Sequence, residues 1–151
     1  MTTSDPRHPP LTERTAFLAN KVGQLLHEQI ESGFGALGLT GRSYYALTVL
    51  ERDVPKSQQE LAELVMVDAT TMGALIDELD ERGLVARSRN KSDRRRYDLT
   101  LSDKGVETLN AANDALAAAE QNFFSPLDKT QRKTIHALLQ RLLVDRWPPP
   151  Q

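Results

Sequence analysis

The densest group of chemically useful side chains in this sequence lies between residues 82 and 97. Against a single acid, Asp93, this stretch carries seven cations: Arg82, Arg87, Arg89, Lys91, Arg94, Arg95 and Arg96. Guanidinium and ammonium groups at this density attract the phosphates of a nucleic acid or the narrow minor groove of DNA. The alternative is a hydrated charge run, in which Arg87 and Arg89 simply form the outer face of a strand.

A predicted β-hairpin carries these cations. Residues 84–89 are expected to form one strand, and residues 90–93 have the composition of a turn. Tyr97, Leu99 and Leu101 alternate with polar residues, which predicts a second, half-buried strand. The basic side chains are therefore expected along the hairpin and at its tip.

Two short helices are predicted immediately before the hairpin. Ser57 and Glu60 have the spacing of a capping box, and Asp68 is a candidate N-cap for a second helix that Gly83 would end. One buried stripe on this second helix is predicted by four apolar residues: Met72, Leu75, Ile76 and Leu79. A helix-turn-helix followed by a basic hairpin is a winged helix, in which the second helix enters the major groove of DNA.

The ordered set of motifs resembles the MarR family of bacterial transcription regulators. The resemblance covers nearly the whole chain and rests on residues 61–63 (LAE), 68–71 (DATT), 79–85 (LDERGLV), 93–95 (DRR) and 101–105 (LSDKG). Residues 93–95 match the Asp-x-Arg signature of the family's wing. The resemblance implies that Arg95 reaches into the minor groove and that Asp93 braces the hairpin through a neighbouring arginine or turn amides. Arg94 and Arg96 would then contact phosphates; the alternative is that they are solvated at the tip.

The predicted recognition helix has few side chains suited to reading bases. The remaining expected DNA contacts are Ser57, Thr70, Thr71, Ala74, Arg87, Arg89 and Lys91. Threonine hydroxyls bond to phosphates or bases, and threonine and alanine methyl groups contact the thymine methyl. MarR relatives often carry a long polar residue on this helix, whereas this chain has no arginine there for a guanine contact. Wing contacts and DNA shape are therefore expected to carry more of the specificity; the alternative is a protein-interaction module that reads DNA weakly.

Long amphipathic helices flank the winged helix. Thr40 is expected to cap a helix that leads into it, Ser102 to cap an alanine-rich helix that follows, and Asp128 to open a last helix. The apolar stripes of the first and last helices exceed what a small core covers, so we expect them to pack against a second copy. The resemblance likewise implies a dimer, which would present two recognition helices to a pseudo-palindromic site.

The predicted organisation is one mainly α-helical domain with a small β-hairpin wing. Residues 1–10 are expected to be a flexible arm, or alternatively an arm that crosses a dimer partner. Within the domain at 11–151, residues 11–39 and 102–146 would form dimerisation helices, and residues 40–101 the winged helix-turn-helix lobe that binds double-stranded DNA.

A ligand site is a further expectation. Regulators of this family often bind a small aromatic or anionic molecule between the two regions. His27, Arg42, Tyr44 and Tyr45 lie on segments that would line such a cleft, and arginine and tyrosine suit a carboxylate or a phenol. The alternative is that the tyrosines belong to the core and Arg42 to the helix surface.

Composition argues against several other classes of protein. The chain has no cysteine, which excludes disulfides and thiolate metal sites, and His8, His27 and His136 lack metal-ligand spacing, so no metal or cofactor is expected. Neither a nucleophile elbow nor a phosphate-binding glycine loop is present, so an enzyme is not predicted.

The polar start and the lack of a membrane-length apolar run favour a cytoplasmic protein. The net charge of −2 weakly opposes nucleic-acid binding, but the cations are concentrated locally.

Overall fold

The computed structural model describes residues 10–52 and 56–146. Residues 1–9 of the predicted arm, residues 53–55 and the chain end at 147–151 lie outside the described residues. The elements are η1 Pro10–Glu13, α1 Thr15–Gly35, α2 Gly41–Leu50, β1 Lys56–Ser57, α3 Gln58–Val65, α4 Ala69–Glu81, β2 Val85–Arg89, β3 Tyr97–Leu101, α5 Asp103–Phe123 and α6 Lys129–Leu143. The predicted fold class, mainly α with a hairpin wing, is confirmed.

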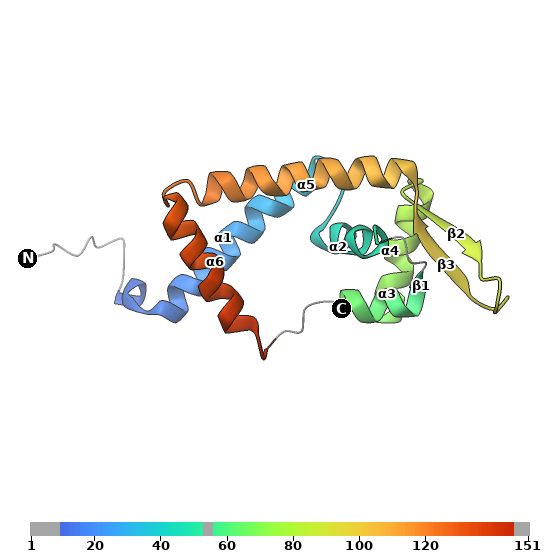
Figure 1. Ribbon diagram of the computed structural model, residues 1–151, viewed down its shortest axis with the longest axis horizontal. Helices are drawn as coiled ribbons and strands as arrows, with labels where there is room; N and C mark the ends of the chain where they lie inside the picture. Colours follow the sequence, from blue (N-terminus) through green and yellow to red (C-terminus); the bar gives the residue numbers. More distant parts are fainter. Residues whose placement is uncertain (1–9, 53–55, 147–151) are drawn as a thin grey trace, which may run out of the picture.

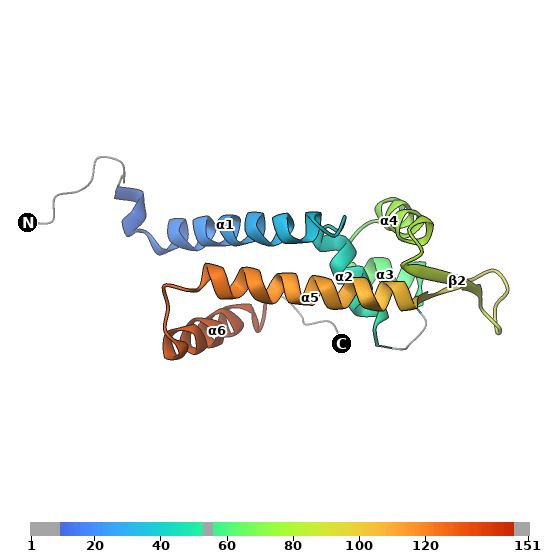
Figure 2. The same cartoon turned by 90° about the horizontal axis from the view of Figure 1, so that it is seen from above.

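The elements form a long molecule with the wing at one end (Figure 1). α1 and α5 lie side by side along its length, and α6 turns back at the end of α5 that is farther from the wing (Figures 1 and 2). α2, α3 and α4 gather at the wing end of α5. This arrangement separates a compact winged-helix lobe from a region of long helices.

Short polar side chains begin five of the helices at the predicted positions. Each cap side chain accepts a hydrogen bond from a backbone amide of the first turn, which otherwise lacks a partner, and the caps are Thr40, Ser57, Asp68, Ser102 and Asp128. Complete capping boxes are present at the starts of α3 and α6. The starts of these five helices therefore follow from local sequence.

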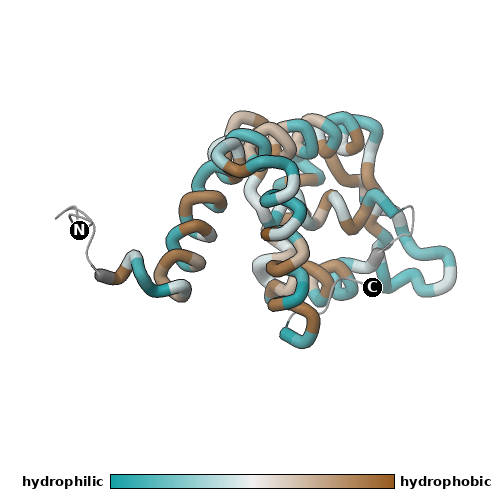
Figure 3. The backbone as a smooth tube through the Cα atoms, turned by 60° about the vertical axis from the view of Figure 1, so that its left-hand side comes forward, coloured by the Kyte–Doolittle hydropathy of each residue, from teal (hydrophilic) through white to brown (hydrophobic). Residues whose placement is uncertain are grey.

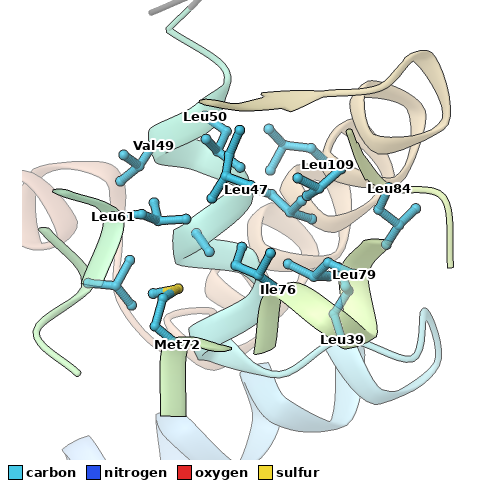
Figure 4. Packing of buried hydrophobic residues seen from close by; sticks show 14 of the residues in the cluster. Leu39, Leu47, Val49, Leu50, Leu61, Met72, Ile76, Leu79, Leu84 and Leu109 are labelled. Atoms are coloured by element: carbon cyan, nitrogen blue, oxygen red, sulfur yellow. The ribbon is translucent and has the colours of Figure 1, made fainter. Parts of the chain in front are cut away.

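The core lies within the winged-helix lobe, where α4 packs against α2, α3 and α5 (Figure 4). Met72, Ile76 and Leu79 form the buried stripe of α4 and are fully inaccessible, while Leu75 is partly buried at its edge. Facing residues come from the other elements: Leu47, Leu50, Leu61, Leu84, Leu99 and Leu109. This packing sets the position of α4, the predicted recognition helix.

Gly83 and Gly105 join the wing to the body of the lobe. Gly83 follows α4 with φ +70°, as predicted for a residue that ends a helix. The Ser102 hydroxyl donates to the Gly83 carbonyl oxygen over 2.6 Å, and the Ser102 amide donates to the Leu84 oxygen. A Cβ on Gly105 would stand 2.1 Å from that Leu84 oxygen, so only glycine lets α5 begin this close to the wing.

α1 continues through Gly33, which packs against Ala115 of α5. Two details differ from the sequence-based expectations. β1 adds a third strand beside β3, giving the order β1-β3-β2. Tyr97 is exposed although its strand was expected to alternate, because the wing extends beyond the core, which Leu99 and Leu101 of that strand reach and Tyr97 does not.

α1 and α6 carry apolar residues that this chain does not cover. Hydrophobic residues recur along both helices (Figure 3), and those left exposed are Phe17, Leu18, Val22, Leu25, Leu138, Leu139, Leu142 and Leu143. No residue of α6 is buried. Among the described residues, no helix is long and apolar enough to span a membrane.

Candidate nucleic-acid interface

Asn90 and Asp98 brace the base of the wing. β2 and β3 pair antiparallel, with Ser88 opposite Asp98 and Arg89 opposite Tyr97. The Asn90 side-chain amide donates to both carboxylate oxygens of Asp98, at 2.9 and 3.0 Å. Its carbonyl oxygen accepts from the amides of Ser92 and Asp93. The sequence predicts Asn90 only as a turn residue, although an asparagine at the start of a turn is typical of this bonding pattern.

Asp93 organises the tip itself. Its carboxylate accepts a hydrogen bond from the Arg95 backbone amide over 3.0 Å, and its carbonyl oxygen accepts one from the Arg96 amide. Of the two ways in which Asp93 was expected to brace the hairpin, this geometry corresponds to bonding with turn amides. The Arg95 side chain is consequently directed by a tight backbone turn, while its guanidinium makes no bond to the carboxylate of Asp93.

Four of the seven cations already have partners within the chain. Arg87 pairs with Asp77 and, at 3.7 Å, with Asp80, both on α4. Arg96 lies 3.4 Å from Glu60 of α3, and Arg89 lies over the ring of Tyr97 with 5.9 Å to its centre. Arg82 donates to the Leu37 carbonyl oxygen, which ties the end of α4 to the loop before α2.

The other three cations gather at the tip. Lys91, Arg94 and Arg95 are exposed, and within the described part of the chain their side chains make no ion pair or hydrogen bond. Charged groups with no internal partner remain available to an external anion. These three lie within five consecutive residues of the same turn. The tip is therefore the most available cationic surface in the winged-helix lobe.

The predicted contacts on α4 differ in availability. Thr70 and Ala74 are exposed. The Thr71 hydroxyl instead donates to the Asp68 carboxylate over 2.6 Å, and the Thr71 amide donates to the other oxygen of that carboxylate. These bonds from the Thr71 hydroxyl and amide stabilise the charged carboxylate and hold the pKa of Asp68 below its ordinary value.

Ser57 is buried, unlike the other predicted contacts. Only 6% of it is exposed. Its hydroxyl accepts from the Glu60 amide over 3.1 Å, and its own amide donates to the Glu60 carboxylate over 2.8 Å. That amide bond is the main cause of a lowered pKa of Glu60, to which Arg96 also contributes. Both polar groups of Ser57 are thus occupied in beginning α3, so its geometry fits a cap better than a DNA contact.

The four residues predicted for a ligand pocket divide into two groups. His27 and Arg42 line an open cleft of about 650 Å³ between α1, the start of α2 and the Thr71–Leu75–Glu78 side of α4. Tyr44 faces elsewhere: its ring stacks on Phe34 at 4.8 Å and its hydroxyl donates to Asn113 of α5. Tyr45 is half-buried and packs against the core. Only His27 and Arg42 are therefore brought together at one cleft.

The helix-turn-helix of α3 and α4, followed by a basic hairpin, defines a winged-helix protein. A model of the MarR family matches residues 37–96, which span α2 to the wing. A putative transcriptional regulatory protein for the hcr operon of Thauera aromatica is 33% identical over 105 residues, which are 70% of this chain and 63% of that protein. The matched region therefore spans less than two thirds of that relative.

Solved structures agree over a larger part of the chain. A probable transcriptional regulator from Pseudomonas aeruginosa is 31% identical, with a TM-score of 0.72 over 87% of this chain and 98% of that one. The transcriptional repressor CouR of Rhodococcus jostii RHA1, bound to a 23-mer DNA duplex, is 26% identical, with a TM-score of 0.78 over 92% of this chain and 99% of that one. The chain belongs to the MarR family, whose members are transcriptional regulators, so it is not an enzyme.

Proposed function

We propose that this protein is a homodimeric, ligand-responsive repressor that binds pseudo-palindromic operator DNA. In each half-site α4 lies in the major groove and the wing reaches the minor groove. The observation that carries this proposal is the set of unpaired cations at the tip, Lys91, Arg94 and Arg95, beside the exposed Thr70 and Ala74 of α4. A repressor of the same family and similar structure, CouR, has been solved on a DNA duplex.

The proposed role of each cation of the wing follows from the partner that it has within the chain. Arg94, Arg95 and Lys91 are the primary contacts, and Arg95 is assigned to the minor groove. Arg96 and Arg89 contact phosphates while they also interact with a partner in the chain, Glu60 for Arg96 and the Tyr97 ring for Arg89. Arg87 is held by Asp77 and Asp80, and its main role is to fix the wing against α4. Thr71 and Ser57 serve mainly as part of the two helix caps.

The second copy is assigned to the long helices. The apolar side chains of α6 are about half exposed or more, with Leu138 at 55% and Leu142 at 57%. Removing the exposed half of such a side chain from water contributes about 1 kcal/mol, and a twofold dimer buries each of them twice. We therefore assign residues 11–39 and 102–146 to dimerisation and residues 40–101 to DNA binding, which sets the two copies of α4 on one face.

Ligand response is assigned to the cleft that His27 and Arg42 line. It lies between α1, which belongs to the dimerisation region, and α4, which faces DNA. Arg42 suits a carboxylate, and His27 an anionic or aromatic group. A molecule bound there favours one spacing of the two recognition helices over another, and it regulates DNA binding only to the extent that its affinity differs between them.

Fluorescence anisotropy with a duplex from upstream of the protein's own gene tests the proposed function. The expected result is binding tighter than to a scrambled duplex, with log Kd rising linearly in log salt. A duplex pool of random sequence serves as the second probe, so that a target elsewhere in the genome is also detected. No preference for any sequence in either experiment would overturn the proposal.

A protein-interaction module is the second candidate. It is favoured by the small residues on α4, since Ala69, Gly73 and Ala74 provide no long polar group. Such a module would show no binding that falls with salt at a slope of ~0.9 per neutralised phosphate. The salt titration therefore separates the two candidates with a single purified protein.

A further inference from the structure

The side of α4 that faces the wing has a gap at Gly73. This glycine has ordinary helical backbone angles, since positive φ in the described residues occurs only at Gly38, Met66 and Gly83. Glycine in a helix interior weakens the helix and is not needed here for the backbone. Its neighbours on the same side, Asp77 and Asp80, pair with Arg87 of the wing. A reason for the glycine therefore has to come from what occupies the space.

The side chain of Gln58 occupies that space. Its Nε2 lies 3.4 Å from the position that a Cβ on Gly73 would take, and within four ångströms nothing else among the described residues meets that position. Gln58 is the first residue of α3, and its side chain therefore crosses from one helix of the helix-turn-helix to the other. A methyl group on residue 73 would be in van der Waals contact with this carboxamide.

The carboxamide of Gln58 is left without a partner. Gln58 is half-buried, yet within the described part of the chain its side chain makes no hydrogen bond. The adjacent Gln59 is different, because its amide donates to Glu63 over 3.4 Å on the surface of α3. Gln58 also lines a groove of about 540 Å³ that runs from the start of α3 to Arg95 and Arg96 of the wing. Its polar end thus lies between the two elements assigned to DNA.

We propose that Gln58 reads an adenine in each half-site, presenting its carboxamide over Gly73 in place of a side chain from α4. A carboxamide offers one donor and one acceptor in a plane, which match N7 and the N6 amino group of adenine in the major groove. This inference rests on the proposed function, and it names the base-reading group of that same DNA site. It accounts for the unpaired amide on α3, which lies over Gly73 of α4.

The two carboxylates on this side of α4 have a partner that competes with a base. Asp77 and Asp80 both pair with Arg87 of the wing. Carboxylates on this side also disfavour a cation that would read guanine, because they would pair with it first. A neutral amide forms no ion pair with these carboxylates, and within the described part of the chain the Gln58 carboxamide makes no hydrogen bond, so its donor and acceptor are available to a base.

Selection from a random duplex pool, followed by sequencing, tests this assignment. Wild type, Gln58→Ala, Gln58→Asn and Gln59→Ala are compared at one salt concentration, with thermal melts to verify equal folding. We expect Gln58→Ala to lose the preference for adenine at one position of each half-site by about tenfold or more. Gln58→Asn has the same carboxamide on a shorter side chain and is expected to lose most of the preference for adenine. Gln59→Ala is expected to retain the wild-type motif.

Replacing that adenine with 7-deazaadenine provides the second readout. The change removes N7 and leaves the rest of the base in place, so it is expected to weaken wild type and to leave Gln58→Ala unaffected. An unchanged motif for Gln58→Ala, or equal losses for both proteins with the modified base, would overturn the role of Gln58 while the regulator function stands. If wild type enriches no sequence at all, the regulator function fails first and this inference fails with it.

Discussion

Helices α4 and α6 have the same amphipathic design and opposite surroundings. Each begins at an aspartate cap and carries apolar residues at helical spacing. In α4 the stripe is fully buried, whereas the equivalent residues of α6 are 46–57% exposed, among them Leu138 and Leu143. The same local pattern therefore makes the interior of one region and an uncovered face in the other.

The apolar stripe of α4 contributes to the folding of one chain, whereas the stripe of α6 is left for the assembly of two. The stripe of α4 finds its partners within the chain, on α2, α3 and α5, so the winged-helix lobe has a core of its own. The stripe of α6 has none of comparable extent among the described residues, and a second copy is the partner that the proposed function supplies. Substitutions in the two stripes should consequently have different kinds of effect.

The largest effect is expected from a charge in the stripe of α4. Ile76→Asp places a carboxylate in a site with no exposed surface and no partner, which is expected to cost more than ~4 kcal/mol of unfolding free energy and to abolish cooperative folding. Circular dichroism melts measure this. The matched control is Ala74→Asp, which adds the same charge on the exposed side of the same helix and should melt near wild type.

The corresponding charge in α6 is expected to act on assembly. Leu139→Asp would bury an unpaired ion in the dimer and cost ~3–5 kcal/mol of association free energy. Sedimentation velocity is expected to show a lighter species at concentrations where wild type is a dimer. Ala137→Asp, on the opposite side of α6, should sediment as wild type does. A Leu139→Asp protein that remains a folded dimer would remove α6 from the interface.

A third test compares two arginines within the winged-helix lobe. Arg95→Ala removes an unpaired cation and is expected to weaken DNA binding by ~1–3 kcal/mol, with loss of preference for a narrow minor groove. Arg87→Ala removes one already paired with Asp77 and Asp80, so its effect on affinity should be smaller. Anisotropy titrations at two salt concentrations measure both. Equal losses for the two variants would contradict the assignment of free and paired cations.

The smallest expected effect concerns pH and the caps of the lobe. The pKa values of Glu60 and Asp68 are lowered in the folded protein, by bonds from Ser57 and Thr71 respectively. A carboxyl group whose pKa is lowered by folding stabilises the folded state at pH values above its ordinary pKa, which is 4.5 for Glu60 and 3.8 for Asp68. This stabilisation is lost as the pH falls through the pKa of the folded state.

Urea unfolding measured at neutral pH and at acidic pH tests this contribution. Glu60→Gln keeps a hydrogen-bonding side chain in the capping box but removes the charge, so the variant should lose less stability than wild type on acidification below about pH 4.5. Gln59→Glu adds a carboxyl one residue earlier, outside the capping box, as a control. Identical pH dependence in wild type and Glu60→Gln would show that the bond from the Ser57 amide does not depend on the charge.

The amino-acid sequence by itself determined the types of most elements, the starts of five helices and the family. Caps such as Ser57 and Asp68 act over three residues, and the stripe of α4 acts over two or three turns, so their consequences are readable without the rest of the chain. The basic composition of the wing is equally local. These properties require no knowledge of what packs where.

Only the tertiary structure decided which of the predicted site residues are available. Arg87 and Arg96 look like Arg94 and Arg95 in sequence, but carboxylates from α4 and α3 reach the first two and not the others. Likewise, Gln58 meets Gly73 only because α3 and α4 cross there. Distances between residues far apart in the chain depend on how helices pack, and that packing follows from the whole core rather than from any short segment.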